Sequence, residues 1–308
     1  MNSSLKRALV NWQAAAIVAF GLPTGSVLDL MASKQAPRDK MIVNVDWLKK
    51  HIDDRDVVLF EVGEKPRYEK EHIPGARYIA MQDLAAPRNP EPGHDLDLPT
   101  PEAARAKLES FGVTDRSTIV VYYGNDWVSP STRVIFTLDW LGLGDRTVLL
   151  DGGLNAWKKA GGQVTADLPT IQPGKLNAKP TKNLVVDAAF VTANKGKPGF
   201  ALIDARSPNM YDGTSPSMKK SGHIPGAKNL PFDQVTDDSY LFKSADTLAQ
   251  WFASAGVKKG DTIIGYCHLG QQATAMLFAA RTLGYNVVLY DGSFHDWEHR
   301  DLPTETGK

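Results

Sequence analysis

The sequence of 308 residues has one cysteine, no net charge and no long apolar run, and each of these shortages argues against a class of protein. A single cysteine cannot form an intramolecular disulfide, which excludes the small disulfide-stapled folds. Lysine plus arginine and aspartate plus glutamate number 35 each, so charge gives no indication of binding to nucleic acid or acidic membranes. No uninterrupted apolar run approaches the roughly 18 residues that span a bilayer. What remains is an ordinary globular composition over about twice the length of one domain, which predicts two domains.

The first 40 residues differ from the rest. Residues 1–28 contain no acidic side chain, Lys6 and Arg7 give a basic start, and residues 8–22 are mostly apolar. This order resembles a secretory signal peptide in outline and predicts a periplasmic or secreted protein. Polar residues interrupt the apolar stretch, so a plain N-terminal extension of a cytoplasmic protein is the alternative.

An internal repeat organises the remainder. Residues 72–76 (HIPGA) recur as residues 223–227, and residues 151–157 (DGGLNAW) recur with changes as residues 291–297 (DGSFHDW). In each half, short runs rich in β-branched residues alternate with amphipathic helical patterns, which is typical of a parallel sheet flanked by helices. The repeat therefore predicts two tandem copies of one α/β domain.

The boundaries follow from composition. Residues 166–182 contain three prolines and little apolar periodicity, so they are predicted to be a linker. The first domain then covers residues 41–165 and the second covers residues 183–308, with residues 1–40 as the extension or signal peptide.

The single cysteine, Cys267, stands where an apolar run over residues 262–266 ends. A short polar loop follows it, and a helical pattern of small residues begins at Ala273. The loop consists of His268, Leu269, Gly270, Gln271 and Gln272. A thiol at this turn faces backbone N–H groups and the positive end of a helix dipole, which favour the nucleophilic thiolate. The alternative is a buried cysteine that serves as a small apolar side chain.

A thiolate in such a loop is suited to sulfur transfer. It can attack the outer sulfur of a small anionic donor, keep that sulfur as a persulfide, and pass it to cyanide or a thiol. The N–H groups from His268 to Gln272 are predicted to stabilise the anionic sulfur, and Gly270 to supply the positive φ that the turn requires. The sequence shows no cluster of histidine, cysteine and aspartate at metal-ligand spacing, so no metal and no organic cofactor is expected.

Taken together, these motifs resemble the tandem-domain sulfurtransferases of the rhodanese superfamily over residues 42–302. The resemblance implies two rhodanese-like domains, of which only the second carries the catalytic cysteine. The equivalent strand end of the first domain, residues 121–126 (VYYGND), indeed has no thiol. Arg133 matches an arginine common in the family's inactive domain, where a structural role is expected.

The resemblance also bears on the sulfur donor. Relatives that use thiosulfate tend to have basic residues after the cysteine, and those that use 3-mercaptopyruvate tend to have small ones; His268 and Leu269 fit neither pattern. A cationic His268, titrating near neutral pH, favours thiosulfate, with 3-mercaptopyruvate as the alternative. Relatives often have an arginine where this chain has Met210.

Other cations are therefore expected to hold the donor's charge. The nearest candidates are Lys219 and Lys220 in a loop inserted in the second half, although a solvated surface pair is the alternative for them. Arg206 belongs to the same predicted site, where it is expected to brace Asp204 or the loop rather than touch the donor.

Two other functions are weighed against sulfur transfer. A cysteine phosphatase needs an arginine six residues after the cysteine to clamp phosphate, but that residue is Ala273. A non-catalytic binding or sulfur-carrier module would not need the intact loop. The expected partners are a small anionic donor and a thiol or cyanide acceptor, with no nucleic acid, no membrane-spanning segment and a monomeric protein.

Overall fold

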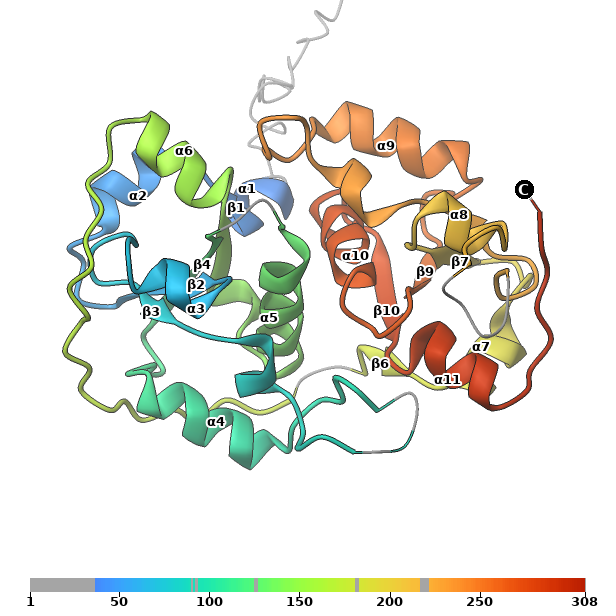
Figure 1. The fold of residues 1–308 in the computed structure, drawn as a ribbon, viewed down its shortest axis with the longest axis horizontal. Helices are drawn as coiled ribbons and strands as arrows, with labels where there is room; N and C mark the ends of the chain where they lie inside the picture. The colour runs from blue at the N-terminus through green and yellow to red at the C-terminus, as the bar shows by residue number, and fades with distance from the viewer. Residues whose placement is uncertain are drawn as a thin grey trace, which may run out of the picture. The chain divides into compact units, whose positions relative to one another are not determined.

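The computed structural model describes residues 37–89, 91, 94–124, 127–180, 183–216 and 222–307. Two five-stranded sheets form the framework, and every strand pair in them is parallel (Figure 1). The strand orders, β1-β5-β4-β2-β3 and β6-β10-β9-β7-β8, are the same arrangement used twice. The predicted α/β fold with two repeated domains is confirmed.

The first sheet takes its strands from residues 42–150. They are β1 (Ile42–Val43), β2 (Val57–Val62), β3 (Arg77–Tyr78), β4 (Thr118–Tyr123) and β5 (Thr147–Leu150). The helices of this half are α1 (Pro37–Met41), α2 (Val45–His51), α3 (Lys65–Tyr68), α4 (Pro101–Ser110), α5 (Ser129–Trp140) and α6 (Gly153–Lys159). Two short 3-10 helices, η1 (Met81–Leu84) and η2 (Gly144–Arg146), complete it.

The second sheet takes its strands from residues 185–290. They are β6 (Val185–Val186), β7 (Phe200–Asp204), β8 (Lys228–Asn229), β9 (Thr262–Tyr266) and β10 (Asn286–Tyr290). Its helices are α7 (Ala188–Asn194), α8 (Pro208–Tyr211), α9 (Ala245–Ser254), α10 (Ala273–Thr282) and α11 (Ser293–His299), with the 3-10 helix η3 (Phe232–Val235). Residues 166–180, the described part of the predicted linker, contain no helix or strand.

The repeated HIPGA motif plays the same structural part in both halves. His72 stacks on Tyr68 at 4.0 Å between ring centroids, and His223 stacks on Tyr211 at 3.8 Å. Each histidine also donates its Nδ1–H to the carbonyl oxygen of that tyrosine, at 2.7 and 2.8 Å. Both histidines are buried, so the motif holds a turn together and does not supply a catalytic group.

Alternation along the central strands divides each sheet into two faces. In β4, Ile119, Val121 and Tyr123 enter one buried cluster, whereas Val120 and Tyr122 enter another. The first cluster continues through α5 and α10 into the second half, where it includes Ile263 and Cys267. Nine residues of α10 are buried, seven of them apolar, and the helix joins the two domains through one core.

The N-terminal predictions are only partly addressed by the structure. Residues 1–36 lie outside the described residues, so a cleaved signal peptide stays a prediction. Helix α1 lies at the end of the predicted extension, and Arg38 donates hydrogen bonds to the carbonyl oxygens of Lys243 and Phe242 in the second half. Within the described ranges, no helix combines the length and apolar character that a membrane crossing requires.

Candidate active site

Cys267 directly follows the central strand β9 and is 1% exposed. Its N–H donates to the Ser293 hydroxyl at 3.2 Å, and its carbonyl oxygen accepts from the N–H of Phe294 at 3.0 Å. The first turn of α11 therefore fixes the backbone of the cysteine on both sides of its Cα. Parallel sheets place their functional groups at this carboxyl end of the strands.

The loop after Cys267 turns directly into α10, as the sequence predicted. Gly270 has a φ of +80°, and a Cβ there would lie 2.6 Å from the carbonyl oxygen of Asp291. Only glycine fits this position, for both reasons. Thr274 secures the start of the helix by donating its hydroxyl to the carbonyl oxygen of Gln271 at 2.6 Å.

The N–H groups of the loop are the chemically important feature. Among the described residues, no acceptor takes a hydrogen bond from the five backbone N–H groups of residues 268–272. Consecutive unpaired N–H groups at the start of a helix form an anion-binding nest. The loop can therefore stabilise a thiolate, a persulfide or the charge that develops during attack on a donor.

Arg206 and Asp204 form a fully buried ion pair at the end of β7. Arg206 donates Nε–H to Asp204 Oδ1 at 3.0 Å and Nη2–H to Oδ2 at 2.6 Å, with a further bond of 2.8 Å to the carbonyl oxygen of Gly222. Its guanidinium also lies 3.9 Å from the ring centroid of Phe294. Burial opposes its charge, but Asp204 outweighs burial and raises the pKa of Arg206. The predicted bracing contact with Asp204 is confirmed.

His268 differs from the expectation of a cation. Its side chain is half-buried, and its Nδ1 is buried without a hydrogen-bond partner among the described residues. Burial first, and then the nearby His295, lower the pKa of His268 below its ordinary value. The neutral imidazole is therefore favoured at neutral pH, and the expectation that this residue supplies positive charge is wrong.

The other predicted residues have different surroundings. Leu269 is 36% exposed, and Gln271 donates its side-chain amide to the Ser129 hydroxyl of α5 at 3.1 Å. Gln272 is half-buried at the end of the loop. Met210 is half-buried in α8. Lys219 and Lys220 lie outside the described residues, so their part in the site stays a prediction.

Arg133 connects the first domain to the loop after Cys267, which the sequence did not reveal. From α5 its Nη1 donates to the Gly270 carbonyl oxygen at 3.0 Å and to Asp291 Oδ1 at 2.6 Å. Its Nη2 donates to the carbonyl oxygen of Leu96. Arg133 is 2% exposed and Asp291 is 8% exposed. Arg133 therefore has the expected structural role, and it acts directly on the turn at Gly270 that follows the cysteine.

Ser293 is a second residue that the sequence analysis missed. Its φ of 54° lies in the left-handed region, yet it is not glycine. The hydroxyl donates to the carbonyl oxygen of Tyr290 at 2.8 Å and accepts the N–H of Cys267. The repeat contained a signal, because the corresponding residue of the first domain is Gly153, with a φ of 53°.

The first domain has a tyrosine at the position that corresponds to Cys267. Tyr123 stands at the end of β4 where the second domain has Cys267, and its hydroxyl donates to the carbonyl oxygen of Tyr240. A Cβ on Gly153 would collide with Tyr123. A buried tyrosine with a hydrogen-bonded hydroxyl occupies this position, so the first domain offers no thiol at its corresponding strand end.

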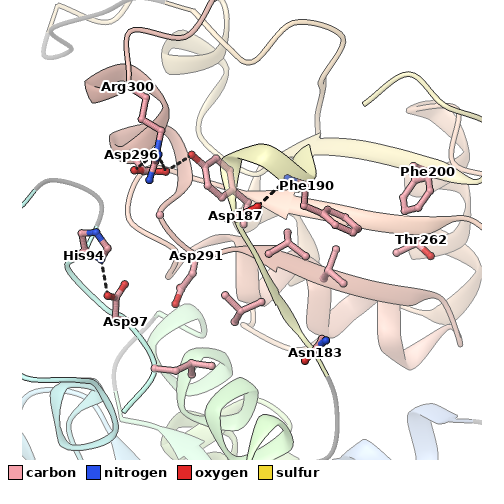
Figure 2. A pocket seen from close by; sticks show the side chains of 16 residues that line it. His94, Asp97, Asn183, Asp187, Phe190, Phe200, Thr262, Asp291, Asp296 and Arg300 are labelled. Atoms are coloured by element: carbon pink, nitrogen blue, oxygen red, sulfur yellow. Dashed lines mark hydrogen bonds and ion pairs between the residues drawn. The ribbon is translucent and has the colours of Figure 1, made fainter. Parts of the chain in front are cut away.

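A cavity of about 850 Å³ lies beside β6 and β10, but neither Cys267 nor any residue of its loop lines it (Figure 2). Its acidic side chains are already paired. Asp97 accepts from His94 at 2.6 Å, Asp296 accepts from Arg300 at 2.7 Å, and Asp187 accepts from the N–H of Phe190 at 2.8 Å. This cavity is therefore not the sulfur-transfer site.

The expectation that no metal is bound stays a prediction, but it overlooked one group of ligand-type side chains on α11. His295, Glu298 and His299 on α11 each offer a ligand atom, and these atoms lie within 4.8 Å of one another. The pattern HxxEH can be read from the sequence at residues 295–299, and its three ligand-type residues share one face of a helix. A cluster at metal-ligand spacing therefore exists beside the active site.

Comparison with known proteins agrees with this geometry. The family model described as a rhodanese-like domain matches residues 44–160 and again residues 187–300. A "Probable 3-mercaptopyruvate sulfurtransferase" from Pseudomonas aeruginosa is 34% identical over 236 residues, which cover 75% of this chain and 82% of that protein. The "Thiosulfate sulfurtransferase" of Bos taurus is 29% identical over 251 residues, 79% of this chain and 82% of that one.

A solved structure shows the same fold at lower identity. The anaerobic ergothioneine biosynthesis enzyme from Chlorobium limicola superposes with a TM-score of 0.76 and 21% identity, over 89% of this chain and 72% of that one. At this identity the likeness concerns the fold alone.

Proposed function

Since the chain belongs to the rhodanese family and is a sulfurtransferase with two rhodanese-like domains in tandem, we propose that it transfers sulfur through a persulfide on Cys267. The observation that carries this proposal is the buried Cys267 at the start of a loop whose five backbone N–H groups, residues 268–272, have no acceptor among the described residues. Those groups lower the free energy of an anionic sulfur without a metal or an organic cofactor.

The reaction has two steps. The Cys267 thiolate attacks the outer sulfur of the donor; a new S–S bond forms, and the bond between that sulfur and the rest of the donor breaks. With thiosulfate the leaving group is sulfite. With 3-mercaptopyruvate it is the enolate of pyruvate, which takes up the proton of the donor's thiol. A thiol or cyanide then attacks the outer sulfur of the persulfide and restores the thiolate.

Of the two donors, we favour 3-mercaptopyruvate, in revision of the thiosulfate prediction. That prediction depended on a cationic His268, and burial lowers the pKa of this residue. The exposed Leu269 and the half-buried Met210 add no charge, so a donor with a single carboxylate needs less compensation than a dianion. The relative from Pseudomonas aeruginosa, which is named for 3-mercaptopyruvate, supports the same choice.

Thiosulfate is the second candidate, because the bovine relative carries that name and Lys219 and Lys220 lie outside the described residues. Steady-state kinetics with each donor at matched concentrations, with cyanide as acceptor, decides between them. We expect the larger kcat/KM with 3-mercaptopyruvate. A larger value with thiosulfate would overturn the donor assignment alone, whereas the absence of a one-sulfur mass increase on Cys267 with both donors would overturn the persulfide mechanism.

A further inference from the structure

The face of α11 beside the catalytic loop carries three ligand side chains one helical turn apart. His295 and His299 are four residues apart and Glu298 lies between them, so all three project from the same side of the helix. One ligand atom from each lies within 4.8 Å of the others. The spacing of two histidines at i and i+4 is a recurrent zinc-binding arrangement on helices.

Hydrogen bonds indicate which ring nitrogen of each histidine carries the proton. His295 Nδ1 lies 2.9 Å from Asp95 Oδ2, and His299 Nδ1 lies 2.7 Å from the carbonyl oxygen of His295. Both oxygens can only accept, so both Nδ1 atoms carry the proton. In a neutral imidazole the lone pair then belongs to Nε2. Metal-ligating histidines are oriented in this way, with the other ring nitrogen donating to a carboxylate or a carbonyl.

We propose that His295, Glu298 and His299 form a binding site for a divalent transition metal ion, with Zn²⁺ as the ion best suited to two imidazoles and one carboxylate. Tetrahedral Zn²⁺ with bonds of about 2.0–2.1 Å holds its ligand atoms about 3.3 Å apart. Rotation of side chains brings the three groups to this separation, since His299 is exposed and Glu298 is half-buried. Asp95 acts through His295 as an orienting residue.

The site lies next to the sulfur-transfer machinery without being part of it. The N–H of His295 donates to the carbonyl oxygen of His268 at 3.1 Å, and the two rings are 5.4 Å apart. A bound metal ion would therefore be adjacent to the loop that holds Cys267. A thiolate also binds Zn²⁺, so the Cys267 thiolate has to be removed before zinc binding is measured.

The experiment is a calorimetric titration of ZnCl₂ into untagged, chelator-treated full-length protein in which Cys267→Ser removes the thiolate. We expect saturable binding of about one ion per chain. His299→Ala and Glu298→Gln in this background should each raise Kd at least tenfold, and Asp95→Asn should raise it by roughly tenfold. His299 is exposed, so the alanine variant should keep the circular dichroism spectrum of its parent.

The matched control is His51→Ala. His51 is half-buried, with its side chain 40% exposed, and is also paired with an aspartate, since its Nδ1 lies 2.7 Å from Asp54 Oδ2, but it belongs to the distant helix α2. This variant should bind Zn²⁺ with unchanged affinity. The proposal is overturned if the parent shows no saturable binding, if His299→Ala binds as tightly as the parent, or if His51→Ala weakens binding equally.

Discussion

Arg133 gives the strongest test of how the first domain contributes to sulfur transfer. The perturbation is Arg133→Met, which keeps the apolar stem and removes the guanidinium. Two consequences follow from the contacts of this side chain. Asp291, 8% exposed, loses its buried cationic partner, and the carbonyl oxygen of Gly270 loses its donor.

The two losses have separate magnitudes. Removing one partner of a buried ion pair typically costs about 3–5 kcal/mol of unfolding free energy, because the other charge remains desolvated. A hydrogen bond from a charged donor contributes about 1.5–3 kcal/mol, so the loss of support for the turn under Cys267 should lower kcat/KM roughly ten- to hundredfold.

A double variant separates stability from activity. Asp291→Asn in the Arg133→Met background removes the unpaired buried charge at nearly constant volume. Urea unfolding should show that most of the lost stability returns, whereas sulfur transfer should stay low because Gly270 still lacks its donor. As a control, Lys65→Ala disrupts only the exposed pair with Glu69 and should change stability by less than about 1 kcal/mol. Recovery of full activity together with stability in the double variant would refute the bracing role of Arg133.

Three further variants test the site itself. Cys267→Ser should keep the fold but abolish sulfur transfer, since a hydroxyl cannot form a persulfide; activity within tenfold of wild type would contradict the mechanism. Ser293→Ala and Ser293→Gly both remove the acceptor for the N–H of Cys267 and should both lower kcat/KM, but glycine suits the φ of 54° and should unfold at higher urea than alanine. Equal kinetics in wild type and both variants would exclude Ser293 from positioning the cysteine. Met210→Arg should lower KM for thiosulfate roughly tenfold or more if the new charge reaches the donor; an unchanged or raised KM would show that this position lies away from it.

The local sequence pattern was sufficient to predict the fold and to single out Cys267 as the candidate nucleophile. The repeated HIPGA motif and the alternation of short apolar runs with helices predicted two parallel α/β domains, because strand and helix periods are properties of neighbouring residues. A single cysteine between an apolar run and a helix of small residues likewise predicted the loop. Gly270 followed from the turn that this loop must make.

Properties of the site that depend on burial and tertiary packing could not be predicted from local sequence pattern. A histidine next to a catalytic cysteine has no fixed charge in the sequence, and only packing against His295 and the loop determines that the pKa of His268 is lowered. Ser293 is similar: its role depends on a backbone conformation that brings its hydroxyl to the N–H of a residue 26 positions earlier.

The sequence alone thus determined the repeat, the α/β fold and the position of the cysteine between strand and helix, since each is specified by residues a few positions apart. Only the tertiary structure decided how the two domains cooperate. Arg133 reaches Gly270 across 137 residues of chain, and no local period relates them. That contact exists because α5 and α10 bury their apolar surfaces against each other in one continuous core, which brings a side chain from the inactive domain under the catalytic loop.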